Sequence, residues 1–271
     1  MRFLRIFLAA SALLTLACLT PAQQPKIRHL LAIGEVKGFE HDSVSHALAT
    51  IEHLGYVSGQ WDTYIRTDSE LITKKNLGRN AKNLNYFDAV LFYTTGELDM
   101  DAQQKKDLLS FIHDDGKGFI GVHSADDTFY QWPEYGEMIG AYFDQHPWMT
   151  FDAPVIIEDP NFPGMQLFPR EFVLNDEMYQ VKNYSRDKVR VLARLDAKKL
   201  DLKNPRVHRT DGDFPLAWAK MYGKGRVFYC TFGHRPETWD RHDIQQMYMQ
   251  AILWSMGVGN PDVTPRPLPK N

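Results

Sequence analysis

Cysteine is nearly absent from this chain, with two cysteines among 271 residues. Cys18 lies in the apolar N-terminal stretch and Cys230 in a predicted strand, so a chain cleaved after that stretch keeps one thiol. A single thiol cannot form a disulfide within the chain. A thiol inside a buried strand is expected to be a core residue rather than a nucleophile.

A basic block is also missing. The net charge is −3, and the lysines and arginines are scattered along the chain. This pattern does not support nucleic-acid binding, so we expect no nucleic-acid partner. The composition is that of an ordinary globular protein, and the length fits one domain.

The long apolar run at the N-terminus, residues 6–19, is shorter than the roughly 20 residues that a membrane span requires. Two arginines precede it and small residues follow it, which is typical of a cleavable signal peptide. We expect residues 1–22 to be removed after Ala22, which predicts a periplasmic or secreted protein with no membrane partner after cleavage. An uncleaved signal anchor and lipidation of Cys18 are the alternatives.

Strands and helices alternate in the first half of the chain. Short apolar runs at residues 28–34, 86–95 and 118–122 predict strands, and helical spacing over residues 44–54 and 101–112 predicts helices between them. This alternation favours right-handed crossovers and a mainly parallel sheet covered on both faces. A weaker strand is expected at residues 58–65 and a short helix plus loop at residues 68–79, with Gly55 ending the first helix.

The second half is richer in strands and ends in a helix. We expect one domain over residues 26–258 and a mobile proline-rich tail over residues 259–271. The predicted strands cover residues 151–158, 172–181, 189–195, 214–221 and 226–231, with a hairpin turn across residues 222–225.

The sequence Gly121-Val122-His123-Ser124-Ala125 follows a predicted buried strand. A small residue two positions before and two after the centre is the pattern of a nucleophile elbow, but the central residue here is a histidine. Ser124 has no activating partner that the sequence reveals, so covalent acyl chemistry is disfavoured. We interpret His123 as a general base or a metal ligand.

Three further histidines lie near predicted strand ends, where open α/β sheets bind their ligands: His41, His146 and His234. A structural role suits any one of them alone, but four histidines near one edge favour a shared site. We predict that these three bind a divalent metal, with zinc as the candidate ion, or orient the substrate. A metal-free site with an imidazole base fits the dispersed spacing equally well.

Asp176 and Glu177 are adjacent, so on a strand they point to opposite faces and at most one of them reaches the pocket. One of the two is predicted to act as the acid or base that partners His123, or to complete a metal site.

Candidate substrate-binding residues surround the elbow: Asp127, Trp132, Tyr135 and Trp148. Aromatic faces stack on the C–H faces of a sugar, and its hydroxyls require hydrogen bonds. Core packing is the alternative for the aromatic residues, and helix capping is the alternative for Asp127.

Three segments resemble the ThuA-like (trehalose-utilisation) family: GFIGVHSADDTFYQWPEYGEMIGAYFDQHPW, NDEMY and PLAW…YGKGRVFYCTFGH. The resemblance covers nearly the whole chain after the signal peptide. It implies a class I glutamine amidotransferase-like fold, a flavodoxin-like three-layer α/β sandwich, in which His123 replaces the catalytic cysteine. Glutaminase activity is therefore not expected. The pocket residues that the resemblance implies are His41, His123, His146, Asp176, Glu177 and His234.

The leading hypothesis is an exported carbohydrate-active enzyme of the hydrolase or lyase type. Its substrate would be a disaccharide, a glycoside or a 3-keto-glycoside, and its chemistry would use histidine and carboxylate groups, with or without a metal. A keto group acidifies a neighbouring C–H bond, which suits an imidazole base. A non-catalytic sugar-binding protein on the same scaffold and a structural module of an exported complex are the alternatives.

Overall fold

One half of the central sheet is parallel. Its strands are β1 (Arg28–Ile33), β2 (Trp61–Arg66), β3 (Ala89–Phe92), β4 (Gly118–Val122) and β11 (Gly225–Cys230). The computed structural model describes residues 27–78 and 80–269, so the predicted signal peptide lies outside the described residues. The parallel strands lie in the order β2-β1-β3-β4-β11. This is the flavodoxin-like order, and it brings the carboxyl ends of β1, β4 and β11 to one edge.

The other half of the sheet is antiparallel and continues from β11. Its strands are β10 (Pro215–Tyr222), β9 (Arg190–Leu195), β6 (Thr150–Ile157) and β7 (Glu171–Glu177), in that order. A turn at Gly223 and Lys224 joins β10 to β11, as the sequence predicts. Strands β5 (Tyr142–Gln145) and β8 (Gln180–Lys182) form a small separate sheet. The sheet is therefore mixed, with a parallel core.

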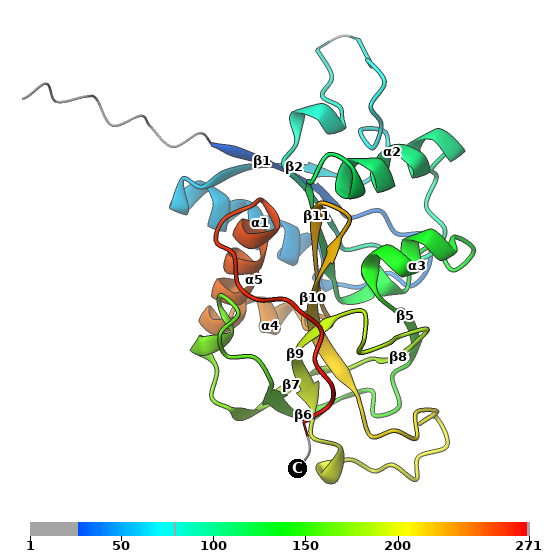
Figure 1. Cartoon of the computed structure of the whole chain (residues 1–271), viewed down its shortest axis with the longest axis vertical. Coiled ribbons are helices and arrows are strands. Elements are labelled where there is room, and N and C mark those ends of the chain that lie inside the picture. The colour runs from blue at the N-terminus through cyan, green and yellow to red at the C-terminus, as the bar shows by residue number, and fades with distance from the viewer. Residues whose placement is uncertain (1–26, 79, 270–271) are drawn as a thin grey trace, which may run out of the picture.

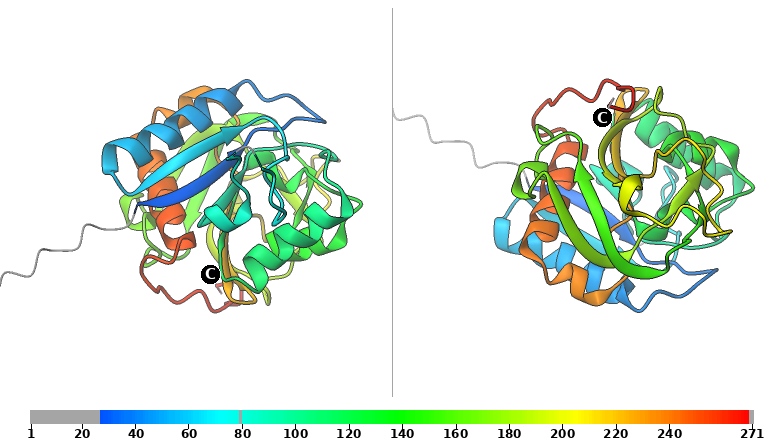
Figure 2. Two further views of the ribbon diagram at one scale, coloured as in Figure 1. Left: turned by 90° about the horizontal axis from the view of Figure 1, so that it is seen from above. Right: turned by 90° about the horizontal axis from the view of Figure 1, so that it is seen from below.

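Helices cover both faces of the sheet, which confirms the three-layer α/β fold (Figures 1 and 2). Helices α1 (Ser43–Ser58), α4 (Pro236–Trp239) and α5 (His242–Ser255) cover one face, and α2 (Ala102–His113) and α3 (Pro133–Ile139) cover the other. Short 3-10 helices span Leu84–Tyr86, His123–Asp126, Met165–Leu167 and Ala197–Lys199. Within the described residues no helix is both long and apolar enough to cross a membrane.

Side-chain alternation along β1 explains the two cores. Leu30 and Ala32 pack into the cluster that contains α1 and α5, whereas Leu31 and Ile33 pack into the cluster that contains α2 and α3. Successive side chains on a strand point to opposite faces, so a strand buried on both faces reads as a continuous apolar run.

Two local predictions were wrong. Helix α1 runs past Gly55 and ends before Gly59, whose φ of 63° suits a glycine C-cap. Gly55 is instead a close-approach position, because an added Cβ would lie 2.6 Å from the Trp61 carbonyl oxygen. The described residues 68–78 form turns and bends rather than a helix. They are held by Asp107, which accepts hydrogen bonds from groups of this segment.

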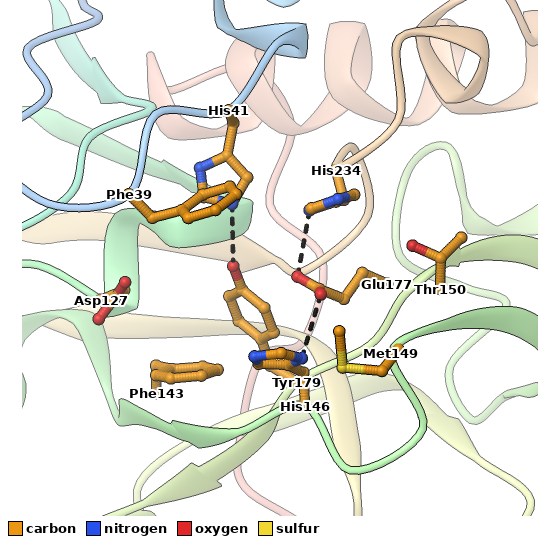
Figure 3. A pocket seen from close by; sticks show the side chains of 10 residues that line it. All are labelled: Phe39, His41, Asp127, Phe143, His146, Met149, Thr150, Glu177, Tyr179 and His234. Atoms are coloured by element: carbon orange, nitrogen blue, oxygen red, sulfur yellow. Dashed lines mark hydrogen bonds and ion pairs between the residues drawn. The ribbon is translucent and has the colours of Figure 1, made fainter.

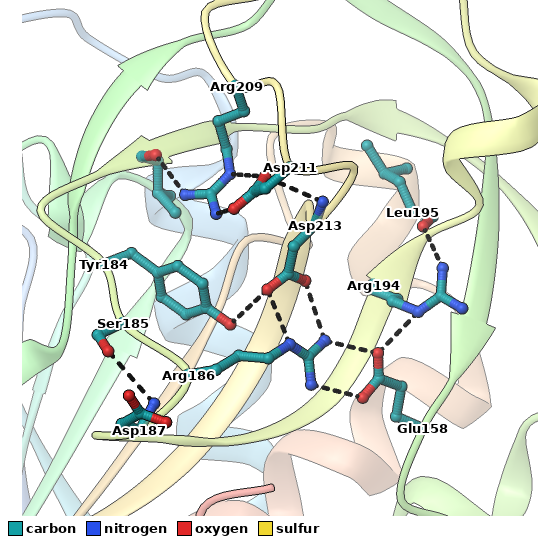
Figure 4. Close-up of polar contacts among 11 residues, drawn as sticks. Glu158, Tyr184, Ser185, Arg186, Asp187, Arg194, Leu195, Arg209, Asp211 and Asp213 are labelled. Atoms are coloured by element: carbon teal, nitrogen blue, oxygen red, sulfur yellow. Dashed lines mark hydrogen bonds and ion pairs between the residues drawn. The ribbon is translucent and has the colours of Figure 1, made fainter. Parts of the chain in front are cut away.

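A buried ionic network braces the antiparallel half (Figure 4). Arg186, in the loop after β8, donates two hydrogen bonds to Glu158 at 2.9 and 2.7 Å and two to Asp213 at 2.7 and 2.9 Å. Glu158 lies just after β6 and Asp213 just before β10, so one guanidinium joins three segments. The same Glu158 forms an ion pair with Arg194 of β9.

The C-terminal segment has no regular secondary structure over residues 259–269. Its backbone is contacted by the domain, since Arg190 donates to the Thr264 carbonyl and Arg226 to the Gly259 carbonyl, both at 2.8 Å. The mobility of this tail stays a prediction.

Candidate active site

The turn after β4 has the sharp geometry that its sequence predicts. His123 has a φ of 44°, in the left-handed region that β-carbon-bearing residues seldom adopt. A Cβ on Gly121 would lie 3.3 Å from the Ala125 Cβ and 3.0 Å from the Tyr229 ring, which explains the small residues around the turn. Backbone strain of this kind persists where surrounding contacts hold it, and it concentrates at functional sites.

Hydrogen bonds orient the His123 ring, which is fully buried. Its Nδ1 lies 2.6 Å from the Thr231 carbonyl oxygen, so Nδ1 carries the proton and donates it there. The lone pair of Nε2 is then directed to the opposite side, where the Tyr179 hydroxyl donates to it at 2.8 Å. A histidine whose other ring nitrogen donates to a backbone carbonyl is the usual arrangement of a metal ligand.

Glu177, at the end of β7, lies at the centre of the histidines (Figure 3). Its Oε2 is 3.1 Å from His234 Nδ1 and 3.7 Å from His123 Nε2, and its Oε1 is 3.2 Å from His146 Nδ1. The side chain is only 8% exposed, so its interactions with these histidines act with little screening by water.

The groups in this cluster shift one another's pKa values. Burial alone would raise the pKa of Glu177, but its contacts with His123 and His234 outweigh burial and hold it well below the usual value. Burial and the neighbouring His123 and His234 lower the pKa of His41 to about 3, so His41 is neutral at physiological pH. Burial opposes protonation of His234, but Glu177 overrides it and raises the His234 pKa.

Four of these groups could hold a metal ion. One ligand atom from each of His41, His123, Glu177 and His234 lies within 4.8 Å of all the others. Three imidazoles and one carboxylate match the donor types of zinc sites. The Nε2 of His41 lies 3.3 Å from the Tyr179 hydroxyl that also donates to His123 Nε2, so both imidazoles present this nitrogen to the same place.

The cluster forms the floor of a cavity of about 460 Å³. This volume is within the usual range of small-ligand sites. Aromatic rings form its walls. The ring centroids of Phe143 and Tyr179 are 4.5 Å apart, and those of Phe39 and His41 are 4.8 Å apart. The lining residues are Phe39, His41, Asp127, Phe143, His146, Met149, Thr150, Glu177, Tyr179 and His234 (Figure 3).

Two acid–base groups face this cavity without belonging to the group of four. Burial raises the pKa of Asp127, against the hydrogen bond that Tyr130 donates to it at 2.5 Å. His146 is 29% exposed and has the Glu177 carboxylate beside one nitrogen. A carboxyl that keeps its proton longer and an imidazole next to a carboxylate are suited to donating and accepting protons.

Comparisons with known proteins identify the family of this chain. The ThuA family, described as trehalose utilisation, matches residues 29–255. The chain belongs to the ThuA family. The ThuA-like protein of Bacteroides uniformis is 21% identical, with a TM-score of 0.68 over 87% of this chain and 94% of that one. The ThuA-like protein of Parabacteroides merdae is 16% identical, with a TM-score of 0.65 over 90% and 94%. A search of curated proteins finds no match.

A β-galactosidase of Bacillus circulans is 10% identical, with a TM-score of 0.53 over 87% of this chain and 32% of that one. At such identities these structures share the fold alone. Membership of the ThuA family suggests a role in carbohydrate metabolism.

In this ThuA-family site Asp176 does not occupy the position that its predicted catalytic role requires. Its carboxylate points away from the cavity and accepts hydrogen bonds from the backbone N–H of Gly233 at 2.7 Å and of Arg235 at 3.0 Å. These two residues flank His234, so Asp176 fixes the loop that carries a cavity histidine. Glu177 is the one of the pair that faces the pocket.

Three aromatic residues predicted to bind substrate lie outside the cavity. Tyr135 is fully buried and donates its hydroxyl to the Ala125 carbonyl, and Trp132 is 7% exposed in the same core. Trp148 packs beside Phe214 and donates to the backbone carbonyl of Asp201, two residues after the 3-10 helix Ala197–Lys199. Tyr135 and Trp132 are thus core residues, and Trp148 is half-buried against the other core cluster.

The other predicted site residues meet as expected, with one change. His41, His123 and His234 come together from the ends of β1, β4 and β11, and Asp127 lines the cavity. His146 also lines the cavity, but it lies beside Oε1 of Glu177 and is not one of the four residues that could hold the ion.

Sequence reasoning missed Phe39 and Tyr179 and did not assign Phe143 to the pocket. Tyr179 follows Glu177 by two residues, in a segment already noted as family-like, so its place carried a usable signal. Phe39 is 63% exposed, and an aromatic ring in a polar loop two residues before His41 was the available clue.

Proposed function

We propose that this chain is a carbohydrate-active enzyme that acts on a disaccharide, a glycoside or a 3-keto-glycoside by acid–base chemistry. The observation that carries the proposal is the combination, in one cavity, of a histidine-bound carboxylate, two further acid–base groups and aromatic walls. The family description, trehalose utilisation, supports a carbohydrate substrate.

His146 is the base that we favour. His123 was predicted for this role, but it is fully buried and its Nδ1 is occupied by the Thr231 carbonyl. His146 is partly exposed in the cavity, and the Glu177 carboxylate 3.2 Å from its Nδ1 would stabilise the imidazolium that forms when it accepts a proton.

Asp127 is the acid that we favour, because its raised pKa keeps the carboxyl protonated to a higher pH than usual. On a 3-keto-glycoside, His146 would remove the proton from the carbon between the carbonyl and the anomeric carbon. The electron pair of that C–H bond forms a C=C bond, the glycosidic C–O bond breaks, and the leaving oxygen takes a proton from Asp127. The faces of Phe39 and Phe143 would hold the sugar ring between these two groups.

We further infer that His41, His123, Glu177 and His234 bind a divalent ion, and zinc is the ion that this donor set favours. A bound ion would supply a Lewis acid for the oxygen of the substrate carbonyl. The Thr231 carbonyl would keep His123 oriented toward it, and the ion would replace the Tyr179 hydroxyl at the Nε2 lone pair.

We also propose that the enzyme works in the periplasm or outside the cell. The support is the signal-peptide pattern of residues 1–22.

The test compares turnover of a 3-keto-glycoside by the chain lacking residues 1–22 and by two histidine variants. His146→Ala is expected to lower turnover by about 10²–10⁴-fold, the usual contribution of a general base. His208→Ala is the matched control, because His208 also pairs with a carboxylate, Asp144, at 2.8 Å but does not line the cavity.

Turnover that His146→Ala leaves unchanged would show that the assignment of the base is wrong. Binding of sugars without turnover by the unaltered protein would instead support the sugar-binding alternative. Elemental analysis of protein purified without chelator tests the ion separately, and less than a stoichiometric amount of any divalent metal, before or after titration with zinc, would contradict it.

A further inference from the structure

A second compartment of about 350 Å³ adjoins the first cavity. It shares four lining residues with the first: Phe39, His41, Thr150 and His234. The two volumes are therefore parts of one cleft, and the histidine cluster lies at the boundary between them. A ligand seated over the cluster can extend into both.

The two compartments differ in chemistry. Phe143, Tyr179 and Met149 line only the first, whereas the residues that line only the second are nearly all charged. These are Glu40, Asp42, Arg235, Pro236 and Glu237. The first compartment suits the face of a ring, and the second suits a unit that presents many hydroxyls and makes hydrogen bonds to charged side chains.

Arg235 is the donor that the structure fixes most firmly in the second compartment. Its backbone N–H donates to Asp176, its Nη1 donates to Asn175, and its Nε lies 3.3 Å from Glu237. The side chain remains 35% exposed. A guanidinium held in this way loses little conformational freedom when it binds a ligand, so its hydrogen bonds contribute more to affinity.

We propose that this cleft has two subsites, and that the second compartment binds the leaving unit of a two-unit glycoside with Arg235 as a specificity-determining residue. The reacting ring occupies the first compartment, because Asp127 and His146 line that one alone. The leaving unit then extends past Thr150 and Phe39 toward Arg235. This inference rests on the proposed carbohydrate function and adds the residues that select the second unit.

The test uses two substrates with the same 3-keto ring, one with a hexose as the leaving unit and the other with a methyl group. The change in the ratio of their kcat/KM values between two variants measures the contribution of the second compartment, because the two leaving groups stay the same. Arg235→Ala is expected to lower this ratio, hexose over methyl, by about tenfold, as expected for the loss of a charged hydrogen bond.

Arg241→Ala is the control. Arg241 precedes helix α5 as Arg235 precedes α4, and it pairs with Asp243 two residues later as Arg235 pairs with Glu237. It lines neither compartment, so its variant should keep the ratio of the unaltered protein. A second variant, Glu40→Gln, removes one charge from an exposed position in the compartment and should also lower the ratio.

Equal losses on both substrates in Arg235→Ala, or an unaltered protein that does not discriminate between them, would overturn the two-subsite proposal and leave the proposed function standing. If neither substrate is turned over, the proposed enzymatic function fails, and calorimetry with the same two compounds decides the subsite question. Tighter binding of the two-unit compound that Arg235→Ala abolishes supports the second subsite, and equal binding refutes it.

Discussion

Removing the charge of Asp176 should affect the protein differently from removing the charge of the adjacent Glu177. Strand β7 directs Asp176 to the loop that carries His234 and directs Glu177 into the cavity. Asp176→Asn and Glu177→Gln keep the size of each side chain and remove one negative charge, so the two variants are matched. The first should mainly lower stability, and the second should mainly impair the site.

The size of the first effect follows from two hydrogen bonds. Asp176 accepts from the N–H groups of Gly233 and Arg235, and each hydrogen bond to a charged group contributes about 1.5–3 kcal/mol. The asparagine keeps one acceptor but presents an N–H where the second acceptor was. Part of this loss is offset because burial, which raises the pKa of Asp176, makes its charge costly. We expect a net loss of about 2 kcal/mol, which lowers Tm by about 4–8 °C in a domain of this size.

The second effect concerns ligand binding. Glu177→Gln removes the only carboxylate of the four-residue group and the charge that raises the pKa of His234. Because changes in groups that merely orient a ligand already cost 10–100-fold in metal affinity, we expect a loss of zinc affinity of at least about 100-fold. Turnover should fall with it.

The Tm of both variants should be measured after treatment with a chelator, because a bound metal would stabilise the folded protein and raise Tm. Zinc affinity is then measured by calorimetry on the folded proteins. The reasoning is refuted if Asp176→Asn melts like the unaltered protein yet loses turnover as Glu177→Gln does, since Asp176 would then be a reacting group.

Three further predictions concern single positions. Tyr179→Phe removes the hydroxyl that donates to the Nε2 lone pair of His123, the atom that would bind the ion, and should raise zinc affinity by up to about tenfold in a calorimetric titration. Arg186→Met removes four hydrogen bonds to Glu158 and Asp213 and the guanidinium that pairs with Asp213, and it should cost about 3–5 kcal/mol in urea unfolding. Burial would raise the pKa of Asp107, but the hydrogen bonds it accepts outweigh this and lower it, so its stabilisation is present above the unfolded pKa of about 3.9 and lost as pH falls below that value. Asp107→Asn should therefore lower stability at pH 7 and make the acid limb of the stability–pH curve shallower.

The convergence of the histidines was predictable because it depends on topology. His41, His123 and His234 follow parallel strands, and the carboxyl ends of such strands meet at one edge whatever the side-chain packing. The elbow was predictable for a related reason, since the small residues that flank His123 are required by the turn itself.

The aromatic walls were not predictable from the same pattern. Trp132 and Tyr135 are close in sequence to the elbow, but α3 directs them into the core, where the Tyr135 hydroxyl finds a carbonyl acceptor. The rings that do line the cavity, Phe39, Phe143 and Tyr179, come from three separate segments. Their meeting depends on how the small β5–β8 sheet and the loop after β1 lie against the main sheet, and this is a tertiary relation without a local sequence signal.

The contacts of His123 explain why we assign the acid–base chemistry to other residues that line the cavity and not to the histidine of the elbow itself. A nucleophile elbow presents its central side chain to the substrate, but here Thr231 and Tyr179 occupy both ring nitrogens of His123, and the ring is fully buried. The strained backbone of His123 therefore orients its ring. It directs Nε2 toward His234 and Glu177. The groups left free to exchange protons with a ligand are those one layer outward, His146 and Asp127. Replacing His123 should accordingly change metal affinity before it changes the pH dependence of turnover, whereas replacing His146 should do the reverse.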